Sequence, residues 1–161
     1  MKTSAIIFTL LIIGLSAQLS FGQSEKELVI KTARALEETP LDKETIKMRE
    51  QALKWVIETD QVTVGLCGGV VGLFSDKKYK YSGDLITTYT IAMAAFKLQN
   101  PDKKSDEKAA QLVGLESALK TYERILKEKP KAKSDTLDSL VSKRNTGELS
   151  ALVATIDCSK Q

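Results

Sequence analysis

Apolar side chains recur at three- and four-residue intervals along most of this chain, and this spacing constrains its fold more than any other feature. The clearest run covers residues 106–128, where the apolar positions are Leu112, Leu115, Leu119, Tyr122 and Leu126. This spacing places a stripe along one side of an α-helix, because a helix turns once in about 3.6 residues. The alternation of apolar and polar residues that is typical of strands does not stand out. The pattern therefore predicts an all-α fold.

Capping residues and prolines divide the chain into about five to seven helices. Thr39 followed by Pro40 is the pattern of an N-cap and first helical residue, and the inward stripe of that helix includes Ile57. A strong stripe over residues 83–99 ends before Pro101. Later helices are expected to begin at the capping residues Ser105, Ser134 and Thr146. These helices must bury their stripes against one another, so we expect a single compact helical bundle.

Residues 62–74 are the ambiguous segment of the chain. The β-branched start suits a strand, whereas the four glycines at positions 65, 68, 69 and 72 suit a loop or a glycine-rich helix. These glycines form two pairs spaced four apart, so a helix here would offer a bare groove for close packing. The spacing matches neither the phosphate-binding nor the dinucleotide-binding glycine motif. We favour a short buried helix in which the glycines serve packing.

Residues 1–22 have the pattern of a secretory signal peptide. A short basic start precedes eleven mostly apolar residues at 5–15, and Ser20 and Gly22 occupy the −3 and −1 positions of a cut before Gln23. Eleven helical residues rise about 16 Å, against a bilayer core of roughly 30 Å. We therefore expect a cleaved leader and a single all-α domain at residues 23–161, with no membrane span in the mature chain. The expected location is the periplasm or the extracellular space.

The two cysteines, Cys67 and Cys158, are expected to form a disulfide, because an exported chain with an even number of cysteines usually oxidises them. The bond would tie the C-terminal helix to the middle of the domain. Free thiols and a redox pair are the alternatives. Redox pairs normally have Cys-x-x-Cys spacing, which this sequence lacks.

One stretch resembles the second helix of a tetratricopeptide repeat. Ala118, Tyr122 and Pro130 have the spacing of its Ala-x-x-x-Phe pattern followed by proline. The repeat's upstream Trp, Leu, Gly and Tyr positions are occupied here by Asp102, Ser105, Asp106 and Ala109. Because a stable array needs at least three copies, the resemblance implies one helical hairpin and not an array.

Histidine is absent, which excludes histidine-based triads, HExxH zinc sites and imidazole general bases. Three Ser-x-x-Lys pairs lack the partner motifs of penicillin-binding enzymes, and no calcium-loop spacing is present. We therefore expect a protein that is not an enzyme and uses no cofactor or metal. The formal net charge of +3 is weak, which argues against a nucleic-acid partner.

The best candidate for a binding surface is a run that interleaves cations with aromatic rings, made of Lys77, Lys78, Tyr79, Lys80 and Tyr81. Tyr89 and Trp55 are added as possible aromatic contacts, because exposed aromatic residues often dominate binding energy. A second basic run at residues 127–133 is interpreted as a helix end followed by a solvated turn.

These features favour a protein- or peptide-interaction module, or a structural module, with an unidentified partner. The first alternative is a carrier of a small apolar molecule or lipid, with a pocket between helices lined by Tyr89, Met93 and Phe96. The second alternative is an enzyme that uses only carboxylates, lysine, tyrosine or serine.

Overall fold

The computed structural model describes residues 24–158. Over this range the chain forms seven α-helices and no strand, which confirms the predicted all-α bundle. None of the helices in this range has the length and apolar character needed to cross a membrane. The predicted signal peptide, residues 1–22, lies outside the described residues.

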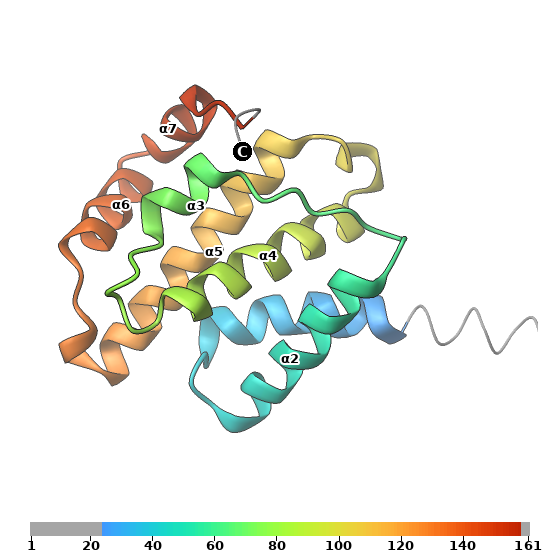
Figure 1. Ribbon diagram of the computed structural model, residues 1–161, viewed down its shortest axis with the longest axis horizontal. Coiled ribbons are helices and arrows are strands. Elements are labelled where there is room, and N and C mark those ends of the chain that lie inside the picture. The colour runs from blue at the N-terminus through green and yellow to red at the C-terminus, as the bar shows by residue number, and fades with distance from the viewer. Residues whose placement is uncertain (1–23, 159–161) are drawn as a thin grey trace, which may run out of the picture.

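Residues 24–38 form a first helix. Six more helices, of seven to 22 residues, and two 3-10 turns follow it. The elements in order are α2 (Lys43–Glu58), α3 (Gly68–Phe74), α4 (Ser82–Gln99), η1 (Pro101–Lys103), α5 (Glu107–Glu128), η2 (Pro130–Ala132), α6 (Asp135–Asn145) and α7 (Leu149–Thr155) (Figure 1).

Helix α4 lies at the centre of the molecule, and α5 runs antiparallel along it (Figure 1). Near the end of α4, Lys97 pairs with Glu107 in the first turn of α5, and Tyr89 in the middle of α4 touches Gly114. The hairpin of α4 and α5 is not in the register of the repeat, because Ala109, which the register assigns to the first helix, lies on α5 together with Ala118 and Tyr122. Ala118 and Tyr122, which carried the resemblance, are 0% and 1% exposed.

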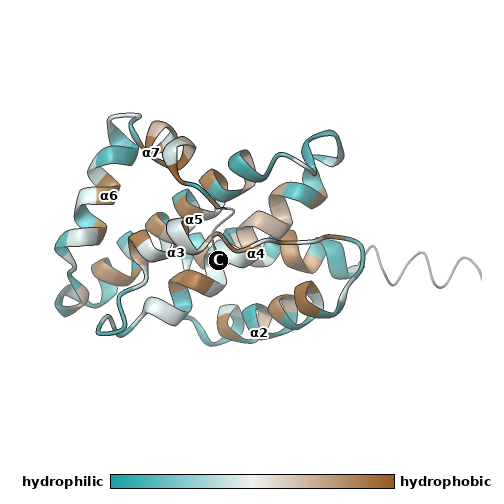
Figure 2. Cartoon of the chain, turned by 45° about the horizontal axis from the view of Figure 1, so that its top comes forward, coloured by the Kyte–Doolittle hydropathy of each residue, from teal (hydrophilic) through white to brown (hydrophobic). Residues whose placement is uncertain are grey.

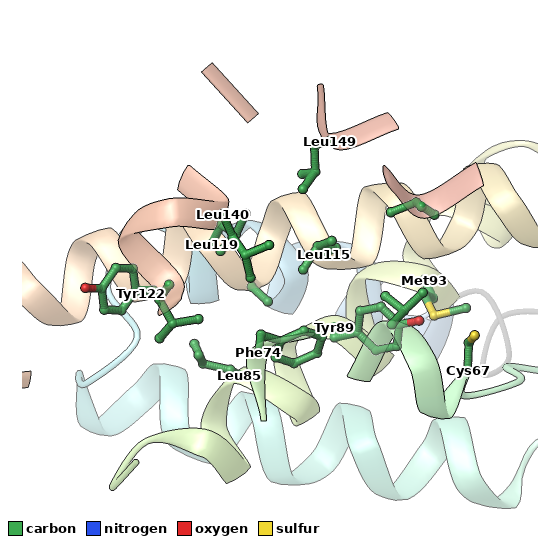
Figure 3. Packing of buried hydrophobic residues seen from close by; sticks show 14 of the residues in the cluster. Cys67, Phe74, Leu85, Tyr89, Met93, Leu115, Leu119, Tyr122, Leu140 and Leu149 are labelled. Atoms are coloured by element: carbon green, nitrogen blue, oxygen red, sulfur yellow. The ribbon is translucent and has the colours of Figure 1, made fainter. Parts of the chain in front are cut away.

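Two hydrophobic cores flank α4. The larger core lies between α4 and α5 and is closed by α3, α6 and α7. Figure 3 shows Leu115 and Leu119 of α5 opposite Phe74 and Tyr89. The smaller core lies on the other side of α4, against α2 and the helix at 24–38. Hydrophilic residues gather in the turns that join the helices (Figure 2).

The start of α2 and its inward face differ from the prediction. Asp42, and not Thr39, is the N-cap, and its Oδ1 accepts from the N–H groups of Glu44 at 2.9 Å and Thr45 at 3.2 Å. Aspartate is a better N-cap residue than threonine, so Asp42 is used in preference to Thr39 three residues upstream. Ile57, which was predicted to face inward, is 73% exposed. Ala52 and Val56, the residue before Ile57, form the inward face at this end of α2.

Two later caps are also shifted. Asp106 caps α5 in place of Ser105 and accepts from the N–H of Ala109 at 3.0 Å. Thr146 ends α6 instead of starting α7, and its hydroxyl donates to the Ser142 carbonyl at 3.2 Å. Gly147 follows with φ of 79°, a conformation that ends helices because glycine adopts it without strain. The predicted Ser134 cap of α6 is confirmed.

The ambiguous segment divides into a non-helical stretch, residues 62–67, and the short helix α3. Of its glycines, Gly69 serves close packing, since a Cβ atom there would lie 2.6 Å from the Ile156 side chain. Gly68 and Gly72 have no atom within 4 Å of that position, so the predicted packing groove is wrong for them.

A disulfide joins Cys67 to Cys158, with the sulfur atoms 2.13 Å apart, as the sequence predicted. It ties the start of α3 to the chain after α7. Lys108 on α5 supports the same segment by donating to the Ile156 carbonyl at 2.5 Å. The C-terminal end of the described chain is therefore held against α3 and α5.

Candidate functional site

The two basic runs of the sequence meet at one end of the molecule. The first occupies the loop between α3 and α4, and the second occupies the turn from the end of α5 through η2; Figure 1 shows both segments at the same end. Between them lies a hollow of about 420 Å³, which we name the lysine hollow. It is lined by Lys78, Tyr79, Lys80, Tyr81, Lys129, Lys131, Ala132 and Lys133.

Most of the positive charge in the lysine hollow has no internal partner. Within residues 24–158, no carboxylate oxygen lies within 4 Å of the ammonium groups of Lys78, Lys80, Lys129 and Lys131. Lys133 forms long contacts of 3.7 Å with two aspartates of α6. Like charges gathered around a concave surface focus the potential and attract anions. The hollow is therefore strongly positive although the whole chain carries only +3.

Tight turns hold the lysine side chains on the rim. In the first loop, the Tyr79 N–H donates to the Asp76 carbonyl at 2.9 Å, and the Asp76 carboxylate accepts from the Lys78 N–H at 2.8 Å. In the second, the Ala132 N–H donates to the Lys129 carbonyl at 2.8 Å. Ala132 is 9% exposed and anchors its turn in the larger core, so the lysines on either side face solvent.

Aromatic rings support the first loop from below. The ring of Tyr79 lies 6.0 Å from that of Tyr81 and 6.2 Å from that of Tyr122, and the Lys80 ammonium lies 5.3 Å from the Tyr81 ring centre. Such ring and cation contacts each contribute on the order of 0.5–1 kcal/mol. Burial raises the pKa of Tyr79 above its usual value of 10, so its hydroxyl stays neutral near pH 7. The floor of the site is therefore aromatic and uncharged.

A second hollow of about 410 Å³ adjoins the first, and both are bordered by Lys78 and Tyr79. We name it the Gly72 hollow. Its remaining lining comes from the end of α3, the loop after it and the start of α6, with Phe74 and Leu137, each 2% exposed, among the lining residues. Both Lys77 and Asp76 line this hollow, so the Gly72 hollow carries charges of both signs.

The structure separates the predicted surface residues into three places. Each of residues 77–81 borders at least one of the two hollows, and Lys78 and Tyr79 border both. Tyr89 is 0% exposed in the larger core and does not reach any surface. Trp55 packs beside the smaller core, where its Nε1 donates to Glu25 at 2.8 Å. These two aromatic residues are therefore not part of the site.

Sequence reasoning missed the contribution of Lys129, Lys131 and Lys133. Their alternating spacing was visible, but it fits the end of a helix and a solvated turn equally well. Only the antiparallel course of α4 and α5 reveals that this turn returns to the loop before α4. The signal that points to a site is two lysine runs at the same end of one helical hairpin.

The predicted apolar pocket lined by Tyr89, Met93 and Phe96 is filled where α4 meets α5. A Cβ atom at Gly114 would lie 2.7 Å from the Tyr89 ring and 2.8 Å from Met93, so these side chains pack against the glycine backbone. Phe96 is partly buried against the larger core. Tyr89 and Met93 therefore serve the helix interface.

No family model, curated protein or solved structure matches this chain, so no catalytic family is assigned to it. Among residues 24–158, no group of three or more cysteine, aspartate or glutamate side chains is arranged to hold a metal ion.

Proposed function

We propose that the protein is an exported, non-catalytic binding module that holds an acidic segment of a partner protein or peptide in the lysine hollow. The observation that carries this proposal is the convergence of two lysine runs on one concavity, where four ammonium groups have no carboxylate partner among residues 24–158. A partner that supplies carboxylates would neutralise this charge, and its hydrogen bonds to the lysine ammonium groups would be stronger than bonds between neutral groups.

The shape of the site favours a narrow peptide over a flat or extended polyanion. The lysines surround a hollow of about 420 Å³ instead of forming a broad stripe. A nucleic acid or a membrane surface requires basic residues spread along a face, and the overall charge of +3 does not supply them. Export is supported by the signal-peptide pattern of residues 1–22 and by the disulfide, since such bonds persist in oxidising compartments.

The proposal is tested by fluorescence anisotropy with a fluorescein-labelled hexaaspartate peptide. We expect the double variant Lys80→Glu/Lys131→Glu, which reverses one charge in each run, to weaken binding at least tenfold. The matched control is Lys54→Glu/Lys103→Glu, which changes the net charge equally at exposed positions on α2 and η1. Binding by the control should stay within twofold of the parent protein at physiological salt, where distant charges are screened.

Equal losses in the two double variants would show that hexaaspartate responds to net charge alone, and the site would be rejected. Absence of measurable binding by the parent protein at low salt would reject an acidic partner altogether.

A further inference from the structure

We propose that the two adjoining hollows together recognise one extended segment, in which an acidic stretch occupies the lysine hollow and a nearby apolar side chain occupies the Gly72 hollow. This inference rests on the proposed function, because it specifies the kind of partner that the same site takes. The feature that carries it is the shared border formed by Lys78 and Tyr79.

The shared border places the two hollows side by side along the loop between α3 and α4. Each has a volume of about 410–420 Å³, near the lower end of the 300–1,000 Å³ that is usual for ligand sites. Each therefore accepts a few side chains and not a folded surface. An extended peptide advances about 3.3 Å per residue, so a segment that crosses Tyr79 reaches both hollows within a few residues.

The two hollows differ in chemistry. Five lysines line the first hollow. The second is lined by the half-buried Leu73 beside the buried Phe74 and Leu137, and its charged lining residues are Asp76, Lys77 and Lys78. An apolar side chain placed there would gain from contact with this apolar lining without displacing water from a concentrated charge. The acidic and apolar parts of the segment thus have separate places.

The second hollow depends on glycine at position 72. Gly72 lines the hollow, and a Cβ atom built on it would meet no other atom within 4 Å, so a larger side chain has room at this position. Leucine at position 72 would fill that space without disturbing the backbone, and leucine is the better helix former. Gly68, on the same helix, is equally open and is absent from the lining, so it provides a matched control.

The test compares labelled peptides and two variants by anisotropy. Two peptides carry Gly-Gly-Leu, one at the N-terminal end and one at the C-terminal end of hexaaspartate. Two control peptides carry Gly-Gly-Gly at the same ends. We expect one leucine peptide to bind the parent protein at least fivefold more tightly than its glycine counterpart. Gly72→Leu should remove this gain and leave hexaaspartate binding unchanged, while Gly68→Leu should change neither. Circular dichroism of both variants checks that they are folded.

The outcomes separate this inference from the proposed function. If hexaaspartate binds and depends on Lys80 and Lys131, but leucine gives no gain at either end, the two-hollow segment is wrong and the acidic partner stands. A leucine gain that survives Gly72→Leu also overturns the inference. If the parent protein does not bind hexaaspartate at all, both proposals are rejected. If heparin binds more tightly than every peptide, and Gly72→Leu does not change its affinity, the site takes a polyanionic polymer and the inference is wrong.

Discussion

Tyr122 on α5 donates a hydrogen bond of 2.6 Å from its hydroxyl to the carboxylate of Asp138 on α6. The same hydroxyl accepts from the N–H of Ser134, the N-cap of α6, at 3.1 Å. The two bonds attach the start of α6 to α5 directly after η2. One buried side chain therefore closes the turn that carries Lys129, Lys131 and Lys133, and so shapes one wall of the lysine hollow.

We expect Tyr122→Phe to lower the free energy of unfolding by about 1–3 kcal/mol, because the partly buried N–H of Ser134 and the carboxylate of Asp138 each lose a partner. Urea denaturation measures the change. In the Asp138→Ala background the same substitution should cost less, since one of the two bonds is already absent. An unchanged denaturation midpoint would show that the hydrogen bonds do not stabilise the turn.

Alkaline pH should destabilise the protein above about pH 10. Burial, together with the hydrogen bond to Asp138, raises the pKa of Tyr122 to about 12, and burial raises the pKa of Tyr79 and Tyr89 as well. The unfolded chain releases these protons near pH 10 while the folded chain keeps them, so stability is complete below pH 10 and falls as the pH rises.

Each of these tyrosines contributes a slope of about 1.4 kcal/mol per pH unit while only the unfolded state is ionised. Urea midpoints at pH 9, 10 and 11 reveal the fall, and Tyr122→Phe should reduce its slope. A stability that does not change between pH 9 and pH 11 would contradict the burial of these hydroxyls.

Gly114→Ala should destabilise the protein by about 1–3 kcal/mol, because overpacking a filled interface forces a shift of helices or side chains. The added Cβ would lie 2.7 Å from the Tyr89 ring and 2.9 Å from the Tyr89 carbonyl oxygen, where α4 and α5 meet. The matched control, Gly72→Ala, should stabilise by about 0.5–1 kcal/mol, since its Cβ meets no neighbour and alanine favours the helix. Thermal denaturation of both variants shows whether the change in stability has opposite signs in the two.

Reducing the disulfide should lower the free energy of unfolding by about 4–5 kcal/mol, because Cys67 and Cys158 are separated by 91 residues and the bond restricts the unfolded chain. The double variant Cys67→Ser/Cys158→Ser should show the same loss without reductant. If the parent protein unfolds at the same urea concentration with and without reductant, the bond contributes nothing to stability.

The helices with long apolar stripes were predicted well from the sequence. Residues 83–99 and 106–128 are α4 and α5 within one residue at each start, because their patterns span four or more turns. The capping residues at the helix ends were predicted less well. Thr39 and Thr146 are plausible caps in isolation, and the choice between each and its neighbour depends on where the packed helix begins.

The site was half visible in the sequence. The loop at residues 77–81 combines aromatic and basic residues that local reasoning detects. The meeting of this loop with the second basic run depends on the antiparallel return of α5, which is a tertiary property. Tyr89 was misplaced for a related reason: α4 lies between two cores, so an aromatic residue on it is buried on nearly any face.

The position of α4 between the two cores also determines how the molecule loses its structure. Its Tyr89 face belongs to one core and its Ile91, Ala94 and Ala95 face to the other. If either flank detached, an apolar side of the central helix would be left facing water, and the remaining part would lose the support of that flank. We therefore expect residues 24–158 to unfold as one cooperative unit, in which neither flank of α4 stays folded without the other.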